Sequence, residues 1–186
     1  MTARPKLGAT AWGYAWLRTV EPTAGRPDPR LPRARAIAHR QESALAVDAS
    51  TITATIADGR REHSVRLRVP PWTDAEAATA EALLASEREH LTTGDIPDHV
   101  HRRLTAAGLT VAVPPDEIEA ICTCRTREAP CMHVLATLYG LVLSVDERPL
   151  TAWELRMPHA ASGRRRDPDW LALSELEPGT FFTGPA

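Results

Sequence analysis

The chain has 186 residues, with 22 basic and 24 acidic side chains and a formal net charge of −2 at pH 7. Its hydrophobic fraction of 43% and charged fraction of 25% are those of a folded globular protein, which excludes general disorder. Because the charges nearly balance, the chain as a whole cannot coat nucleic acid, and any such contact depends on a local basic patch. The length allows one domain, or one domain with a small satellite.

Apolar runs and cysteine spacing indicate in which compartment the protein works and whether it contains disulfides. The longest apolar run, residues 134–143, is too short to cross a bilayer, and the N-terminus has no apolar stretch with a small-residue cleavage site. We therefore expect a cytoplasmic protein with no membrane contact. The three cysteines, Cys122, Cys124 and Cys131, lie within ten residues of one another. That is a poor disulfide framework and indicates a metal site or a thiol centre.

The first 33 residues are interpreted as an aromatic N-terminal segment followed by a proline-rich linker. The even spacing of Trp12, Tyr14 and Trp16 would place all three on one face of an extended segment, and we expect them to pack against the main domain. Residues 21–32 contain four prolines and a glycine, which is typical of a loop.

Residues 34–108 are predicted to form an α+β domain that begins with a small antiparallel β-meander. β-Branched residues recur at period two in residues 44–47, 52–56 and 65–69, and Asp58-Gly59 is a hairpin turn, so we expect three or four strands. Four arginines lie on or beside this sheet and are interpreted as a solvated polar face: Arg60, Arg61, Arg66 and Arg68.

Helices follow the sheet. Thr73 and Glu76 form a capping box for a helix over residues 74–90. Asp95 is expected to cap a second helix over residues 96–107, which Gly108 closes in the left-handed conformation.

Residues 109–146 are predicted to be a strand–loop–helix module. Alternating apolar residues at 109–113 and the stretch 117–121 are expected to be extended, and residues 132–145 carry the strongest apolar helical stripe. Residues 147–186 are expected to be a short helix, capped by Thr151 and Glu154, and a mobile tail.

The residues with the clearest chemical role are four potential metal ligands: Cys122, Cys124, Cys131 and His133. Three sulfurs and an imidazole are a standard closed ligand set of structural Zn²⁺. Residues i and i+2 of a strand face the same way, so Cys122 and Cys124 can reach one ion. Cys131 is then expected in the turn before the helix and His133 in its first turn. This places one metal at the joint of strand and helix.

Other interpretations of these residues stay open at this point. They are a catalytic Cys–His pair, a catalytic zinc, a redox switch that ejects zinc on oxidation, and buried cysteines without metal. A Cys–His pair leaves the other cysteines without a role, and four protein ligands leave a catalytic zinc no open position.

The cysteine–histidine motif resembles the SWIM-type zinc finger, C-x-C-x(n)-C-x-H. The Trp12-Gly-Tyr-Ala-Trp16 segment and the arginine-containing residues 33–40 extend the resemblance to bacterial SWIM zinc-finger proteins over residues 10–157. The resemblance implies a structural Zn²⁺, a module that binds DNA or protein, and a Swi/Snf-class helicase-like ATPase as partner. Many members carry an aromatic residue in the loop between the cysteine pairs, which residues 125–130 lack.

Two accessory functions compete. In the first, arginines neutralise phosphates of a nucleic acid; they are Arg125, Arg127, Arg164, Arg165 and Arg166. In the second, the chain is an adaptor that docks on a protein, with Trp12, Trp16 or Phe181-Phe182 as anchors. A purely structural zinc protein without nucleic-acid contact is a further alternative.

An enzyme is not expected. The remaining histidines do not assemble a site by spacing, and neither a phosphate-cradling glycine loop nor a nucleophile elbow is present. We therefore expect no small-molecule substrate.

Overall fold

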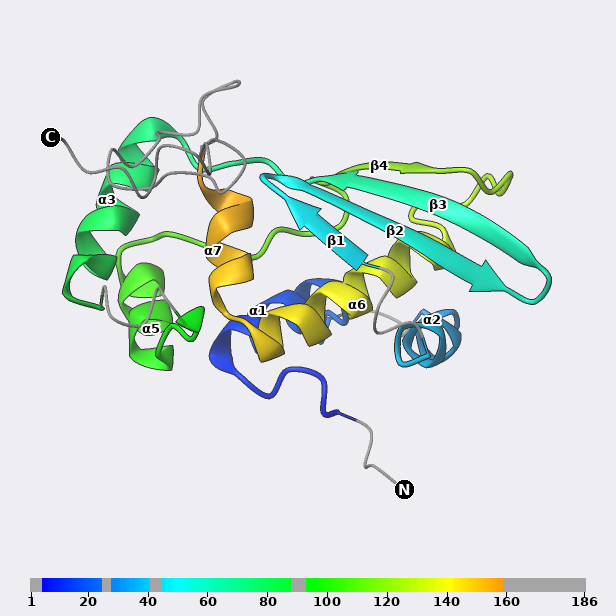
Figure 1. The fold of residues 1–186 in the computed structure, drawn as a ribbon, viewed down its shortest axis with the longest axis horizontal. Coiled ribbons are helices and arrows are strands. Elements are labelled where there is room, and N and C mark those ends of the chain that lie inside the picture. Colours follow the sequence, from blue (N-terminus) through cyan, green and yellow to red (C-terminus); the bar gives the residue numbers. More distant parts are fainter. Residues whose placement is uncertain (1–4, 25–27, 41–44, 88–92, 159–186) are drawn as a thin grey trace, which may run out of the picture.

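The computed structural model describes residues 5–24, 28–40, 45–87 and 93–158 of the chain. These residues form one four-stranded antiparallel sheet and six α-helices (Figure 1), which confirms the predicted α+β class. The predicted tail and the phenylalanine pair near the C-terminus lie outside the described residues.

The sheet is a meander in chain order. It consists of β1 (Leu45–Asp48), β2 (Thr51–Asp58), β3 (Arg61–Arg68) and β4 (Glu119–Cys122), each antiparallel to its neighbour. Gly59 occupies the β2–β3 turn with φ +66, a conformation that glycine adopts without steric cost. The expectation of three or four antiparallel strands is confirmed.

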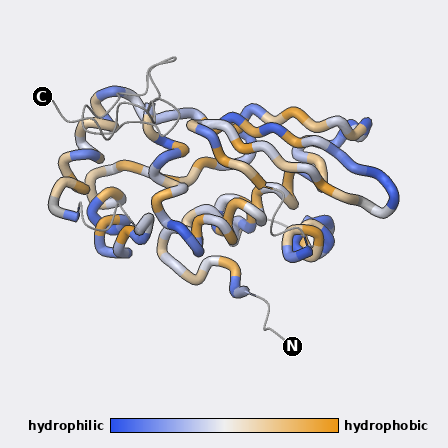
Figure 2. Tube along the Cα trace, in the orientation of Figure 1, coloured by the Kyte–Doolittle hydropathy of each residue, from blue (hydrophilic) through white to orange (hydrophobic). Residues whose placement is uncertain are grey.

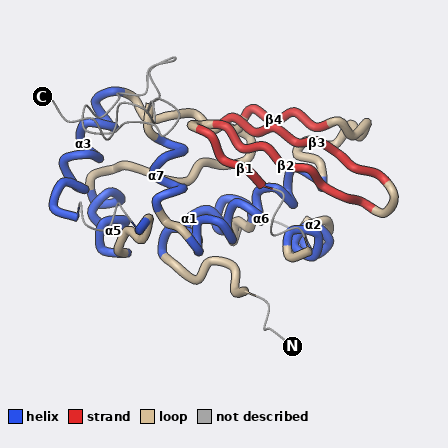
Figure 3. The backbone as a smooth tube through the Cα atoms, viewed as in Figure 1, coloured by secondary structure: helices blue, strands red, loops and turns tan. Residues whose placement is uncertain are grey.

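The two faces of the sheet differ in chemistry. Alternate residues of β2 and β3 point to the interior and are buried: Ile52, Ala54, Ile56, Val65 and Leu67. The positions between them carry threonine, serine and arginine and are largely exposed. Helix α6 packs on the buried face, so the sheet and the helices form two layers, with the polar face turned away from α6 (Figure 3).

Helix α6 (Met132–Glu147) is the centre of the core. Ten of its residues are buried, including all six of the predicted apolar stripe. The helix contacts α1 (Ala11–Val20) and α2 (Leu31–Ala38) on one side and all four strands on the other. A helix that is apolar all round must be covered on all sides, and this arrangement covers it.

The N-terminal aromatic segment is helical, so an extended conformation is wrong. The expected packing against the main domain is right for Trp12 and Trp16 but not for Tyr14. The side chain of Thr10 accepts a hydrogen bond from the backbone N–H of Gly13 and caps α1. In a helix, residues four apart share a face, so Trp12 and Trp16 are both fully buried. Tyr14 falls on the other face, where 54% of its surface is exposed.

Helix α2 begins in the predicted loop of residues 21–32 and continues into the start of the predicted α+β domain, ahead of its predicted strands. Pro32 stands in its first turn, where a proline is tolerated because that backbone N–H has no helical partner. Ile37 is buried against the core. Arg35 pairs with Glu21, which also accepts a hydrogen bond from the Tyr139 hydroxyl of α6. Burial and this bond to Glu21 raise the pKa of Tyr139.

The remaining helices form a second group beside the end of the sheet. Helix α3 (Asp74–Leu84) begins with the predicted Thr73–Glu76 capping box and continues as a 3-10 turn, Ala85–Glu87. Helices α5 (Asp98–Ala106) and α7 (Leu150–Arg156) follow. Trp72 and Trp153 make an edge contact at 5.4 Å between ring centroids, which ties α7 to the segment before α3.

Three predictions for residues 95–151 are wrong: the caps of two helices and one strand. Pro97, not Asp95, is the N-cap of α5, and Pro149, not Thr151, is the N-cap of α7. Residues 109–113 are not a strand, although their alternate residues are buried. The side chains of Leu109, Val111 and Val113 pack in the core, and the Thr110 carbonyl accepts a hydrogen bond from the Trp72 indole N–H (3.0 Å) rather than from a neighbouring strand.

Contacts cross the boundary predicted at residues 108 and 109. Strand β4 pairs with β3, and α6 packs against α1 and α2. The four predicted segments themselves stay a prediction. None of the helices in the described ranges is long and apolar enough to cross a membrane.

Asp146 fastens α1 to the far end of α6. Its carboxylate accepts hydrogen bonds from the backbone N–H groups of Gly8 (2.7 Å) and Thr10 (2.9 Å) and from the Thr10 hydroxyl (3.0 Å). A Cβ atom on Gly13 would lie 2.1 Å from Asp146 Oδ1, so this glycine is required by the close approach of the two helices.

We expect Gly13→Ala to lower the free energy of unfolding by about 2 kcal/mol, because the new methyl group displaces the Asp146 carboxylate from its hydrogen bonds with Gly8 and Thr10. Gly140→Ala is the matched control in α6, since its Cβ would meet only the flexible end of Leu45 at 3.2 Å. Urea denaturation of both variants measures the effect. Equal stabilities of the two variants would contradict the importance of the Asp146 contact.

Candidate metal centre

Cys122 and Cys124 come from the end of β4 and the two residues after it. The backbone N–H of Thr123 donates to the Ser64 carbonyl (3.0 Å), and the Ser64 N–H donates to the Thr123 hydroxyl (3.0 Å). These bonds hold the chain against β3 beyond the end of the strand. The two sulfurs, two residues apart on an extended chain, can therefore share one side.

Cys131 and His133 come from the beginning of α6. Cys131 is the N-cap residue, and its sulfur accepts from the Val134 N–H at 3.5 Å. His133 lies in the first turn of the helix. Both side chains are buried, with 5% and 7% of their surface exposed. The helix start thus carries two donors inside the protein, as the sequence predicted.

The four side chains meet at the joint of strand and helix. One potential ligand atom from each lies within 4.8 Å of the others, in an arrangement that could hold a metal ion. Cys122 Sγ is 3.8 Å from His133 Nδ1, which is about the separation of two ligands of one tetrahedral ion with bonds of about 2.0–2.3 Å. The prediction that these residues form one cluster is confirmed.

The pKa values of two of the cysteine thiols bear on whether the cluster can bind a cation. Burial raises the pKa of the Cys122 thiol to about 12 when no cation lies beside it. Burial also opposes ionisation of Cys124, but hydrogen bonds from the backbone of Thr126 and from the other two cysteines outweigh it and lower that pKa. A divalent cation would compensate the charge of thiolates here, where water does not.

Two residues that the sequence analysis did not single out support the cluster. The ring of His63, on β3, stacks on the ring of His133 with centroids 4.1 Å apart. Arg30 donates to the Pro130 carbonyl (2.8 Å) and to Glu128 (3.1 Å), which fastens the loop before Cys131 to the start of α2. Neither role has a local sequence signal, since each depends on elements that are distant in the chain.

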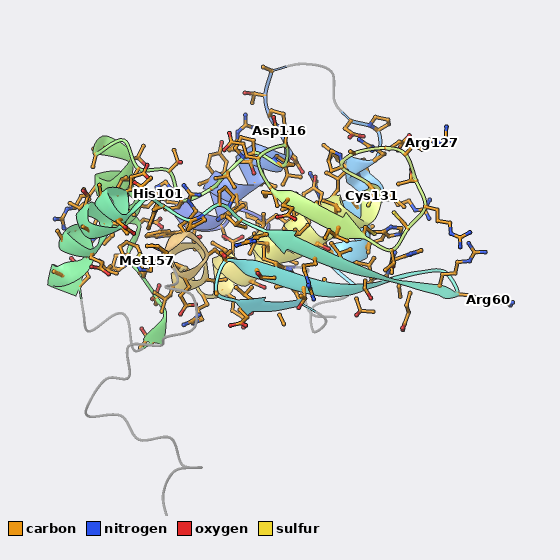
Figure 4. All side chains as sticks on the ribbon, turned by 90° about the horizontal axis from the view of Figure 1, so that it is seen from above. Arg60, His101, Asp116, Arg127, Cys131 and Met157 are labelled. Carbon is orange, nitrogen blue, oxygen red and sulfur yellow. The ribbon has the colours of Figure 1, made fainter. Side chains whose placement is uncertain are left out.

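The candidate arginines are divided between two regions. Arg125 and Arg127 are exposed in the loop between the cysteine pairs. Figure 4 shows Cys131 inside the molecule, with Arg127 and Arg60 projecting outward at the same end. The other three candidates, Arg164, Arg165 and Arg166, lie outside the described residues, so the structure does not place them near the cluster.

Comparison with known proteins leaves the function open. No protein-family model matches the chain, and no solved structure matches it. The chain is 30% identical over 165 residues to a Mycobacterium tuberculosis protein named "Uncharacterized protein Rv2102". The match covers 83% of this chain but 58% of that relative, so the chain spans little more than half of the relative's length.

We expect the affinity of this centre for a divalent metal to rise with pH, because cysteine ligands must lose protons before they bind. The Cys122 thiol, with its raised pKa, is protonated at pH 7, so acidification favours release of the metal and alkalinisation favours binding. The expected change is about tenfold per pH unit for each proton displaced. Co²⁺ titrations at pH 6, 7 and 8, followed by the sulfur-to-metal charge-transfer absorption, measure it.

Cys122→Ser is the control for that titration, because it removes one of the thiols that must ionise. Its affinity should be lower and less dependent on pH. An affinity of the unaltered chain that does not change with pH would contradict binding through thiolates.

Proposed function

We propose that Cys122, Cys124, Cys131 and His133 hold a structural Zn²⁺ in a SWIM-type module, and that the chain is a non-enzymatic accessory factor that binds DNA. The observation that carries this proposal is the approach of four donor atoms to within 4.8 Å at the joint of β4 and α6. The donor set is that of closed structural zinc sites, whose four protein ligands leave no position for a substrate.

Energetics support a structural role for the metal. Binding of zinc by such a ligand set contributes about 10–16 kcal/mol, while a whole domain has a net stability of about 5–15 kcal/mol. Strand β4 has four residues, and three of them are exposed. A metal shared between β4 and α6 would hold this short strand to the core.

DNA is the partner favoured by the surface around the cluster. Arg125 and Arg127 are exposed on the loop that the metal would brace. Glu128, the acidic residue between Arg127 and α6, shares Arg30 with Asp28. The two arginines of the loop outnumber the one acidic residue in it, which leaves an excess of positive charge for a phosphate.

A protein adaptor is the second candidate, and the partner implied by the resemblance is a Swi/Snf-class helicase-like ATPase. Two of its expected anchors, Trp12 and Trp16, are fully buried and cannot serve. Tyr14 and Ile121, exposed by 54% and 59%, are the large hydrophobic side chains that could replace them. The two accessory roles are compatible, since Tyr14 lies on α1 and the loop arginines lie beyond β4.

We expect protein purified without chelator to contain one equivalent of zinc by elemental analysis. Removal of the metal should lower the melting temperature and increase hydrogen exchange over residues 117–147, because β4 loses its connection to α6. The same chelator should have no effect on Cys131→Ala, which lacks one ligand. A zinc content well below one equivalent in the unaltered protein would contradict the proposal.

We expect Arg125→Ala/Arg127→Ala to weaken binding of a 20-base-pair DNA duplex and to reduce the slope of log affinity against log salt by about 2, one for each lost phosphate contact. Fluorescence anisotropy between 50 and 200 mM salt measures both quantities. The double variant Arg102→Ala/Arg103→Ala removes the same charge from α5 and is the control. If both double variants behave like the unaltered chain, the loop does not bind DNA.

A further inference from the structure

The β2–β3 hairpin extends beyond the rest of the sheet. Strand β1 pairs only with the first half of β2, residues 51–54, and β4 pairs only with the second half of β3, residues 65–68. Ile56 is buried and His63 stacks on His133, so it is residues 57–62 that project as a short two-stranded ribbon (Figure 1), the strongly hydrophilic stretch in Figure 2. Arg60 and Arg61 form its tip.

The ribbon and the loop between the cysteine pairs bring arginines to the same end of the molecule. Arg60 and Arg127 both project there in Figure 4. Among the side chains that the structure describes, no ion pair involves Arg60, Arg66, Arg125 or Arg127. Acidic residues face the other two arginines of the sheet in the register: Asp58 lies opposite Arg61 and Glu119 lies opposite Arg68, so the inference depends on Arg60 and Arg66.

The exposed face of the sheet continues this surface. A shallow hollow of about 360 Å³ lies on it, and Arg66 stands at its centre, opposite Thr53 on β2 and Ile121 on β4. Four hydroxyl-bearing residues also line the hollow: Thr53, Thr55, Ser64 and Thr123. Arginine, serine and threonine are side chains that contact DNA phosphates.

We propose that the β2–β3 ribbon and the hollow around Arg66 form a second DNA-binding surface, continuous with the loop that carries Arg125 and Arg127. This inference rests on the proposed DNA-binding function and assigns it a larger surface. Duplex DNA is the fitting ligand, because a two-stranded ribbon fits the major groove and its phosphates complement the arginines. None of the side chains that line the hollow is aromatic, so it offers no platform for stacking of single-stranded bases.

The test compares Arg60→Ala, the ribbon variant, and Arg66→Ala with the unaltered full-length chain on the same 20-base-pair duplex. The salt slope should fall by about 1 for each variant, with affinity reduced roughly tenfold for each lost contact at 0.1 M salt. Arg60→Lys keeps the charge and should keep the slope. Thermal melting of each variant checks that the fold is intact, and Arg102→Ala/Arg103→Ala is again the matched control.

The outcomes separate this inference from the proposed function. If the ribbon and Arg66 variants keep the unaltered slope while Arg125→Ala/Arg127→Ala loses about 2, the second surface is wrong and the loop function stands. If the ribbon and Arg66 variants lose slope while Arg125→Ala/Arg127→Ala keeps it, the second surface binds DNA and the loop assignment fails. Absence of duplex binding by the unaltered chain, or tighter binding of a single strand of equal length, overturns the inference.

Discussion

The structure depends on the joint between the end of β4 and the start of α6. On one side of this joint is a four-residue strand with mostly exposed side chains, and on the other is a helix with ten buried residues. Three sulfurs and an imidazole converge at this joint, in an arrangement that could hold a metal ion. A short exposed strand gains little from apolar burial, so a metal ion bound there would add to the hydrogen bonds that hold the strand to β3.

Helix α6 connects this joint to the rest of the fold. Its start carries two of the donors, and near its other end Asp146 accepts hydrogen bonds from Gly8 and Thr10, just before α1. Midway, the Tyr139 hydroxyl donates to Glu21, which also pairs with Arg35 of α2. One buried helix therefore links the candidate metal centre, both N-terminal helices and the sheet, which explains why the N-terminal segment and the cysteine segment pack as neighbours.

The surface chemistry follows from the same arrangement. Helix α6 covers one face of the sheet, so the opposite face keeps its threonines, serine and arginines. The hairpin extends past its shorter neighbours, and the loop between the cysteine pairs lies at the same end. Arg60, which the sequence analysis interpreted as part of a solvated face, thereby lies at the same end of the molecule as Arg127 of the loop, and both proposals use this end.

The sequence alone determined the elements whose signals are local. The i, i+2 spacing of Cys122 and Cys124, the capping box at Thr73 and the apolar stripe of residues 132–145 each operate within a few residues, so they predicted the ligand cluster, the start of α3 and the central helix. Only the tertiary structure decided what depends on distant partners. Trp12 and Trp16 are buried together because α1 places residues four apart on the face that packs on the core. Residues 109–113 alternate like a strand, but they pack into the core and bond to Trp72, which is distant in the chain. His63 meets His133 because β3 packs against α6.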